Sequence, residues 1–314
     1  MVGMDAVDDA LAHLRVTGSM VGRTLVDPPW GLAVDSAYPC VLAAATQGTM
    51  WVTYGDAAPF LVEEGGVVIV AGGAVLRLGD RPNSPVDVVI NDRDACFDPA
   101  TGADLSQSCS LGGRTFGDPD GSVSVLVGAY HSTSETYAMF NQDLPDVVVL
   151  PPNDDVTPVL GVIAAEATRN RPGQQVAVDR LMELLAIATI RRWLGENPDA
   201  VGWPTALEDP VVGPALQAIR EDPAQPWTVA SLAAEAAVSR AAFARAFTAR
   251  VGVPPLTHLR RWRMAVATDL MRAEPHLSLA EVAARVGYGD QFGFSTAYRR
   301  VRGVAPSTAR RRAA

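Results

Sequence analysis

The stretch TVASLAAEAAVSRAAFARAFTAR, residues 228–250, has the pattern of two short helices joined by a tight turn. Leu232 and Ala233 fall on one face of the first helix, which gives that helix a side to bury. A break follows at Ala237, and Ser239 is a residue type that caps the start of a helix well. The apolar positions of the second helix are Phe243, Ala246 and Phe247.

The opposite face of that second helix offers small residues and cations. Its members are Ser239, Arg240, Ala241, Ala244, Arg245 and Thr248. A helix fits the major groove of B-DNA, and a preceding helix can brace it and touch the phosphate backbone. We therefore expect this face to bind DNA.

The stretch SLAEVAARVGYGDQFGFSTAYRR, residues 278–300, repeats the pattern. Gly287 marks the turn, Asp290 is the expected N-cap, and Phe294 and Tyr298 lie on the expected buried stripe. The outward positions of its second helix are Gln291, Phe292, Ser295, Thr296 and Arg299. One such pattern alone is equally typical of a helical hairpin in an ordinary bundle. Two copies in the same order favour a pair of DNA-reading units.

A continuous helical pattern, residues 256–272, joins the two copies. At about 1.5 Å per residue this helix spans roughly 25 Å. That length suits two recognition helices held about one DNA turn, roughly 34 Å, apart on one face of the duplex. We expect the joining helix to be the common core of both copies.

The charges divide the chain in two. Its 314 residues carry a formal net charge of −9 and are 48% hydrophobic, enough for two globular domains. From residue 222 onward, 14 arginines stand against six carboxylates, a net charge of +8. Before that point 12 arginines stand against 29 carboxylates, a net charge of −17. Only the C-terminal part is therefore suited to attract phosphate.

The first 150 residues consist of short β-type runs separated by Gly, Pro and Asp, which is typical of a sandwich or barrel. The runs are residues 22–26, 31–34, 41–45, 49–54, 67–70, 75–78, 86–90 and 123–129. Residues 92–121 are rich in Asp, Ser, Gly and Pro, so we expect a long surface loop there.

Helical patterns follow at residues 158–168, 174–194 and 210–220. Val178, Leu181 and Leu185 lie along one line of the second helix, where they serve either a homodimer contact or packing within the chain. A polar, proline-containing stretch begins at Glu221 and gives the clearest domain boundary. We predict three parts: a domain at 1–150, a helical linker and dimerisation segment at 151–221, and a DNA-binding domain at 222–314.

These runs are similar to those of a known family. WTVASLAAEAAVSRAAFARAF, RWRMAVATDLM and SLAEVAARVGYGDQFGFSTAYRRVRGVAPS together resemble the AraC/XylS type of bacterial transcription regulator. The first two hundred or so residues resemble, more loosely, the cupin-like effector domain of many such regulators. The resemblance implies an α+β chain with a β-barrel sensor, a helical dimerisation segment and two C-terminal helix-turn-helix units. It also implies promoter DNA and RNA polymerase as partners, and activation more often than repression.

Position by position, the resemblance assigns base contacts to Ala241, Ala244 and Arg245 in the first unit. In the second unit it assigns them to Gln291, Phe292, Ser295 and Thr296. Three positions depart from the family: Ala237 stands where a turn glycine is usual, Thr296 where arginine is common, and Arg302 where Phe generally precedes Gly303. We therefore expect the second unit to read sequence less sharply and to act more as a clamp on the DNA backbone, with Arg299 contributing to binding of any sequence.

Cupin barrels are often metal enzymes, which makes an enzyme with an accessory nucleic-acid domain the rival class. Such chemistry needs several His and a carboxylate converging on one metal. The chain has only His13, His131, His258 and His276, and no His-x-His pair lies on the predicted strands. We expect no metal, no cofactor and no catalysis.

Two other ways of sensing remain open for the N-terminal domain. A barrel can hold a small-molecule effector, and Trp30, Trp51 and Leu76 are candidate lining residues, although such side chains also serve as plain core. Cys96 and Cys109 flank the expected loop and could form a disulfide under oxidant, which is the alternative of a redox-sensing regulator.

The compartment is predicted from the cysteines and from the lack of targeting signals. Three cysteines are an odd number without zinc-site spacing, and the sequence has no signal peptide or long apolar span. We expect a cytoplasmic homodimer with reduced thiols.

Overall fold

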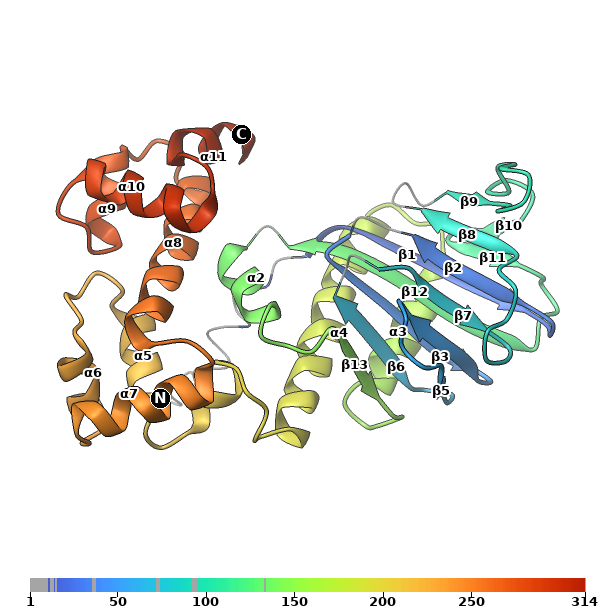
Figure 1. The fold of residues 1–314 in the computed structure, drawn as a ribbon. Coiled ribbons are helices and arrows are strands. Elements are labelled where there is room, and N and C mark those ends of the chain that lie inside the picture. The colour runs from blue at the N-terminus through green and yellow to red at the C-terminus, as the bar shows by residue number, and fades with distance from the viewer. Residues whose placement is uncertain are drawn as a thin grey trace. The chain divides into compact units, whose positions relative to one another are not determined.

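The computed structural model describes residues 11, 14, 16–35, 38–71, 74–91, 95–132 and 134–313 (Figure 1). The described chain divides into two compact units. Of the described residues, the sheet unit comprises 16–131 and 145–193, and the helical unit comprises 11, 14, 132–144 and 194–313. These limits do not coincide with the predicted boundaries after residues 150 and 221, because two further segments pack with the C-terminal helices. His13 lies outside the described residues.

The sheet unit is built from two sheets. The seven-stranded sheet has the order β10-β11-β1-β12-β3-β6-β13. Its strands are β1 (Val16–Val26), β3 (Cys40–Gln47), β6 (Val67–Ala71), β10 (Ser110–Gly112), β11 (Thr115–Gly117), β12 (Val123–Ser132) and β13 (Val147–Leu150). The six-stranded sheet has the order β5-β4-β7-β2-β8-β9. Its strands are β2 (Gly31–Asp35), β4 (Met50–Tyr54), β5 (Phe60–Val62), β7 (Leu76–Gly79), β8 (Val88–Asn91) and β9 (Cys96–Phe97).

Every predicted β-type run lies in or overlaps one of these strands. The expected loop at 92–121 is corrected in part, because it contains β9, β10 and β11. Strands of two or three residues are too short to show the alternation of apolar and polar side chains that marks a strand in sequence. The remainder of this region is turns, in which Asp98 and Asp104 accept backbone N–H bonds.

The core of the sheet unit lies between the two sheets, where alternate side chains of facing strands meet. From β3, Val41, Ala43 and Ala45 join this core. Leu42 and Ala44 point to the other face of β3 and are also fully buried. A strand covered on both faces reads as a continuous apolar run, which is why VLAAA shows no alternation.

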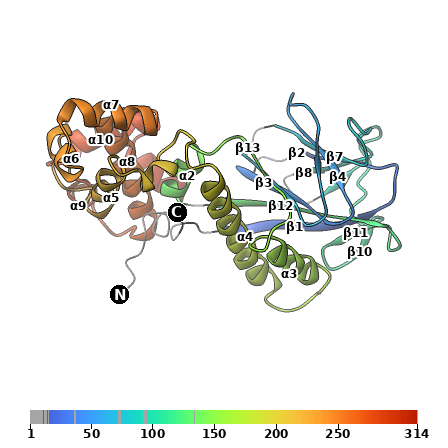
Figure 2. The same ribbon diagram turned by 90° about the horizontal axis from the view of Figure 1, so that it is seen from below.

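Helices α3 (Thr157–Ala167) and α4 (Gln174–Glu196) lie against the seven-stranded sheet (Figure 2). Asp179 of α4 accepts bonds from the backbone N–H and the hydroxyl of Ser19 on β1, at 2.9 and 2.5 Å. Val178 and Leu185 are completely buried within the chain. These two predicted dimer residues therefore pack inside the protein, because they lie on the side of α4 that its own unit covers.

The helical unit is organised around α8 (Pro255–Ala273), which confirms the predicted joining helix. The other helices of this unit are α2 (Glu135–Asn141), η1 (Thr205–Glu208), α5 (Gly213–Glu221), α6 (Val229–Glu235), α7 (Arg240–Val251), α9 (Leu279–Arg285), α10 (Gln291–Arg302) and α11 (Pro306–Ala313). None of the helices in the described part of the chain is both long and apolar enough to cross a bilayer.

Aromatic rings connect α7, α8 and the segment around η1. Phe247 contacts His258 at 5.8 Å between ring centroids, and His258 contacts Trp203 at 6.0 Å. Trp203 in turn lies 5.8 Å from Trp262, and the Arg220 guanidinium lies within about 6 Å of both indole rings. Residues 203–221 thus complete the core of the first helix-turn-helix unit, which explains why the unit begins before residue 222.

Candidate nucleic-acid interface

The first helix-turn-helix unit consists of α6 and α7, and each helix begins at a capped residue. The Thr228 hydroxyl accepts the backbone N–H of Ser231 at 3.0 Å, and the Ser231 hydroxyl accepts that of Thr228 at 2.9 Å. Ser239, the predicted N-cap of α7, accepts the backbone N–H of Ala242 at 3.2 Å. These bonds satisfy amide groups that the first turn of a helix leaves without partners. The buried side of α7 is Phe243, Phe247 and Val251.

The second unit, α9 and α10, repeats this arrangement with charged caps. The Glu281 carboxylate accepts the backbone N–H of Ser278 at 2.7 Å, and Asp290 accepts those of Phe292 and Gly293 at 2.8 Å each. A carboxylate at a helix N-terminus also interacts favourably with the helix dipole. Phe294 and Tyr298 form the buried side of α10, as predicted.

The candidate DNA-reading side chains all lie on the outward sides of α7 and α10. Ala244 and Ser295 are half-buried, and the others are exposed: Ser239, Arg240, Ala241, Arg245, Thr248, Gln291, Phe292, Thr296 and Arg299. Phe292 is 74% exposed, which is unusual for an aromatic ring without a partner surface. The assignment of these residues to DNA contacts stays a prediction.

A shallow hollow of about 390 Å³ lies on the outward side of α10. Its lining residues are Phe292, Ser295, Thr296, Arg299 and Arg300. The Ser295 hydroxyl donates to the backbone oxygen of Gln291 at 2.7 Å, which engages its proton within the helix. The sequence pattern did not indicate Arg300 as a DNA-facing residue, because its position falls between the outward and buried stripes of the helix.

Arg263 is a second residue that the sequence did not single out. Its guanidinium donates to the backbone oxygens of Pro223 and Gln225, each at 2.7 Å, and of Gly287 at 3.4 Å. The same group lies 5.8 Å from the Tyr288 ring. Arg263 of α8 thereby ties the segment before α6 to the turn of the second unit. The proline-containing stretch that begins at Glu221, predicted as a domain boundary, is held in place by these bonds.

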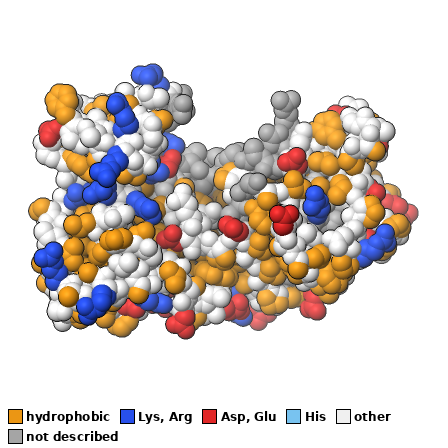
Figure 3. Space-filling view, viewed as in Figure 1, with side chains coloured by type: hydrophobic (Ala, Val, Ile, Leu, Met, Phe, Trp, Pro, Cys, Tyr) orange, Lys and Arg blue, Asp and Glu red, His pale blue; other side chains and the backbone are white. Residues whose placement is uncertain are grey.

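Positive charge gathers over the helical unit. In the view of Figure 3, most of the arginine side chains lie over these helices. Arg240, Arg245, Arg299 and Arg300 are exposed on the two recognition helices. Guanidinium groups can pair in a bidentate manner with phosphate or with guanine.

The candidate effector residues of the sheet unit separate into two groups. Trp30 and Leu76, 5% and 1% exposed, belong to the core between the sheets. Trp51 lies on β4 between Met50 and Val52, which both face that core, so its half-buried ring is on the other face. The Trp30 Nε1 group is buried and has no hydrogen-bond partner among the described residues.

None of the three cysteines forms a disulfide within the described chain. Cys96 is 7% exposed and belongs to the core between the sheets, whereas Cys109 is half-buried. Burial raises the pKa of Cys40 to about 12, so this thiol stays protonated and unreactive. Redox pairing of Cys96 with Cys109 stays a prediction. Within the described ranges, no group of three or more His, Cys, Asp or Glu is placed to hold a metal ion.

Comparison with known proteins agrees with this architecture. A cupin family model matches residues 5–195, and a helix-turn-helix domain model matches residues 232–312. A protein of Streptomyces antibioticus named an AraC-like transcription regulator is 30% identical over 314 residues, covering 98% of this chain and 99% of the relative. The transcriptional regulator AlkR of Acinetobacter baylyi is 36% identical over 138 residues, covering 44% of this chain and 45% of AlkR.

Among solved structures, the DNA-binding domain of AdpA in complex with a target DNA is 31% identical and covers 33% of this chain and 91% of that chain, with a TM-score of 0.31. The family models and the full-length relative establish the family. This chain belongs to the AraC-like family of transcription regulators, with a cupin-type N-terminal domain and a DNA-binding helix-turn-helix domain at its C-terminus.

Proposed function

We propose that this regulator binds promoter DNA in a sequence-specific manner through α7 and α10, and that it activates transcription in response to a small-molecule effector. The observation that carries the DNA-binding part is that two capped recognition helices pack on one joining helix with the predicted reading residues turned outward. A recognition helix reads bases with the side chains that face away from its own core.

In this proposal, Arg245 is the residue that discriminates most strongly between bases. It is exposed on α7, and its neighbours Ala241 and Ala244 are small enough to let the helix approach the base edges. A bidentate arginine–guanine pair contributes about 1–3 kcal/mol of discrimination against the wrong base. The test is to select duplexes from random DNA with the full chain and then compare Arg245→Ala with the unchanged protein.

We expect Arg245→Ala to lose affinity for the selected duplex and to keep its affinity for a scrambled duplex. Arg299→Ala, which removes an exposed charge, is the matched comparison and should weaken both duplexes alike. Equal loss on both duplexes for Arg245→Ala would show that this residue contacts only the backbone.

The dimer contact that we propose uses the outward side of α4. Ala177, Leu181, Leu184 and Ala188 recur at spacings of four and three residues, and each is at least partly exposed. Leu184 is 49% exposed. An apolar stripe at this spacing suits packing of one helix on another. Sedimentation should show a dimer that Leu184→Glu converts to a monomer and that Val162→Glu, on exposed α3, leaves intact.

The effector that we propose is a small molecule with an apolar body and one hydrogen-bond acceptor. Its support is the buried Trp30 Nε1 group among apolar neighbours such as Leu76 and Leu78. A buried donor without an acceptor is costly, and a ligand that supplies the acceptor removes this cost. Small carboxylic acids and ketones should be screened for an increase in Tm, with Trp30→Phe as the variant that keeps the ring and loses the donor.

Activation is tested by transcription in vitro. Run-off transcription with RNA polymerase from a promoter containing the selected duplex should increase when the protein is added, and increase further with an effector found in the screen. A decrease in transcript at protein concentrations that occupy the site would indicate a repressor.

A further inference from the structure

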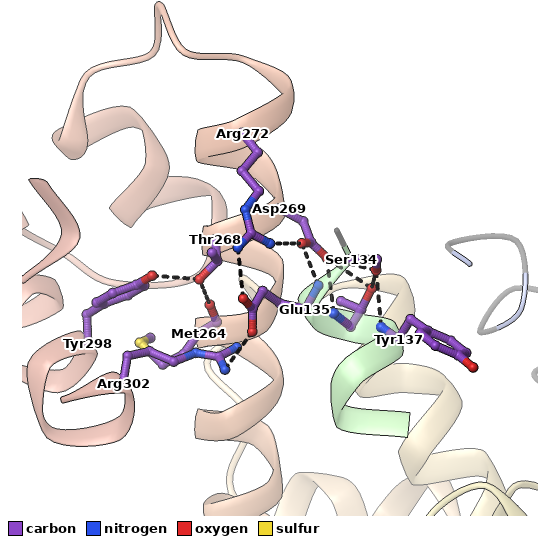
Figure 4. Close-up of polar contacts among 10 residues, drawn as sticks. Ser134, Glu135, Tyr137, Met264, Thr268, Asp269, Arg272, Tyr298 and Arg302 are labelled. Atoms are coloured by element: carbon purple, nitrogen blue, oxygen red, sulfur yellow. Dashed lines mark hydrogen bonds and ion pairs between the residues drawn. The ribbon is translucent and has the colours of Figure 1, made fainter. Parts of the chain in front are cut away.

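The short helix α2 connects two strands of the seven-stranded sheet, β12 and β13, yet it packs in the helical unit. Its sequence, ETYAMFN, has no apolar stripe long enough to predict this packing. The contacts are instead polar at its start, where α2 meets α8 (Figure 4). The connection between β12 and β13 therefore contributes one helix to the helical unit.

The Asp269 carboxylate of α8 accepts hydrogen bonds from the first residues of α2 and from the residue before it. One carboxylate oxygen accepts the backbone N–H of Glu135 at 2.7 Å. The other accepts the backbone N–H and the hydroxyl of Thr136, at 3.1 and 3.0 Å, and the hydroxyl of Ser134 at 3.3 Å. Thr136 is only 5% exposed, so these bonds are shielded from water and are stronger for it.

Glu135 then bridges two arginines that come from different helices. Its Oε1 lies 3.0 Å from Nη2 of Arg272 on α8, and its Oε2 lies 2.9 Å from Nη1 of Arg302 on α10 (Figure 4). The side chains of Glu135 and Arg302 are each 24% exposed, and that of Arg272 is 34% exposed. One carboxylate thus joins the last turn of α8 to the last turn of the second recognition helix.

This bridge gives a purpose to Arg302, which stands where the family generally has Phe. Next to it, the Tyr298 and Thr268 hydroxyls form a 2.7 Å hydrogen bond between α10 and α8. Besides the apolar packing between them, α10 and α8 are thus linked by one buried hydroxyl pair and by the ion pairs of Glu135. Only the ion pairs depend on a residue that lies between strands of the sheet unit.

The far end of the segment is held as well. The indole N–H of Trp203 donates to the backbone oxygen of Met139 at 3.4 Å, and the Trp203 backbone N–H donates to Asp143 at 3.3 Å. Burial raises the pKa of Asp143 from its ordinary value. Residues 134–143 are thus fixed on the helical unit at both ends.

We propose that Glu135 is a positioning residue for the second DNA-reading helix, and that its pairs with Arg272 and Arg302 set the orientation of α10 on α8. The proposal rests on DNA reading by α7 and α10. Loss of the pairs with Arg272 and Arg302 alters the second half of the DNA contact. The ion pairs of Glu135 seen in Figure 4 join it to α8 and α10 and not to α6 or α7.

The test uses the full chain and a duplex selected from random DNA, in three forms: intact, with the bases facing the first unit scrambled, and with the bases facing the second unit scrambled. Glu135→Gln keeps the backbone N–H bonds to Asp269 and removes the charge. We expect it to weaken binding to the intact duplex roughly three- to tenfold, as expected for the loss of two partly exposed ion pairs. On the duplex with the second part scrambled, Glu135→Gln and the unchanged protein should bind equally.

Two further variants separate positioning from general damage. Glu166→Gln removes the carboxylate of an ion pair at 3.2 Å on α3 of the sheet unit, and should bind all three duplexes as the unchanged protein does. Arg302→Met should reproduce the Glu135→Gln effect, and the double variant should lose less than the product of the two single losses, because both break the same pair. A melting temperature within a few degrees of the unchanged protein shows that each variant is folded.

A loss of equal size on all three duplexes, or full additivity with Arg302→Met, would overturn the proposal. If the unchanged protein selects no duplex at all, DNA reading itself fails, and this outcome is distinct from the others.

Discussion

Ala237 and Gly287 occupy the corresponding turns of the two helix-turn-helix units, and both have a left-handed backbone, with φ of 53° and 77°. An L residue with a Cβ atom is strained in this region by roughly 1–2 kcal/mol, whereas glycine is not. The first unit therefore contains strain at a position where the second unit has none. We expect Ala237→Gly to stabilise the protein by about 0.5–1 kcal/mol in urea unfolding.

The reverse change in the second unit is the matched comparison. A Cβ atom on Gly287 would lie 2.5 Å from the backbone oxygen of Ala224 and 2.6 Å from Nη2 of Arg263. We expect Gly287→Ala to lower the free energy of unfolding by about 2 kcal/mol or more, from strain and from displacement of Arg263. If both substitutions changed the free energy of unfolding only slightly, the left-handed backbone would not be the source of strain at these turns.

Loss of the Arg263 guanidinium should destabilise the helical unit. Arg263→Met keeps the length of the side chain but leaves the backbone oxygens of Pro223 and Gln225 without their charged donor. Hydrogen bonds to charged groups contribute about 1.5–3 kcal/mol each, and partial exposure lowers this, so we expect a loss of about 2 kcal/mol. Urea unfolding measures it. Arg263→Lys should recover only part, because an ammonium group cannot reach three separate oxygens in a planar fork.

His258 should make the stability depend on pH. Burial, with Arg261 and Arg220 nearby, lowers the pKa of His258 to about 3 from its ordinary value of 6.5. Because the unfolded chain takes up a proton below pH 6.5 and the folded chain does not, stability is lost as the pH falls from 6.5 toward 3. Between pH 6.5 and 5 the loss should be up to about 2 kcal/mol.

His258→Phe is the variant that isolates this effect. The ring fits among Phe247 and Trp203, and Nε2 of His258 has no hydrogen-bond partner within the described chain, so little is lost by removing it. The difference in unfolding free energy between this variant and the unchanged protein should grow in favour of the variant as the pH is lowered. A difference independent of pH would show that the pKa of His258 is the same in the folded and the unfolded chain.

We expect Phe292 and Thr296 to contact thymine methyl groups. They lie one turn apart on α10 and line the hollow on its outward side, with Phe292 74% exposed. Apolar side chains read thymine by its 5-methyl group, and burial of one methyl contributes about 0.8 kcal/mol. Replacing single thymines by deoxyuridine in the second half of a selected duplex should therefore weaken binding about three- to fivefold at one or two positions.

Thr296→Ser is the companion variant, since it removes one methyl group from the protein and keeps the hydroxyl. At the base pair that Thr296 contacts, this variant should bind the thymine and deoxyuridine duplexes alike. Deoxyuridine outside the selected sequence should have no effect in either protein. Insensitivity to deoxyuridine throughout the second half would show that α10 contacts only the backbone.

The helix-turn-helix units could be predicted because their information is local. Caps such as Ser239 and Asp290 and buried pairs such as Phe294 with Tyr298 lie within a few residues of one another. The side of α4 that faces inward could not be predicted in this way, because Val178 and Leu181 are both apolar. Which of them is buried depends on the sheet, which comes from distant parts of the chain.

The limits of the units were harder to predict for the same reason. The proline-containing stretch after Glu221 has the composition of a linker, yet Arg263, some forty residues later, binds its backbone. The segment 132–144 shows no linker composition at all. Its place in the helical unit depends on Asp269 and Trp203, contacts between residues 60 or more positions apart.

The chain passes between its two units after residues 14, 131, 144 and 193. Many two-domain proteins are joined by one strand of polypeptide, and their domains can be exchanged between relatives by a single fusion. Here a chimera joined at residue 222 would leave behind Trp203, Arg220 and Glu135, and so both an aromatic core and a bridge to the second reader. A functional exchange of sensing domains would need to carry residues 132–144 and 194–221 with the recipient, or replace both sides of every contact that they make.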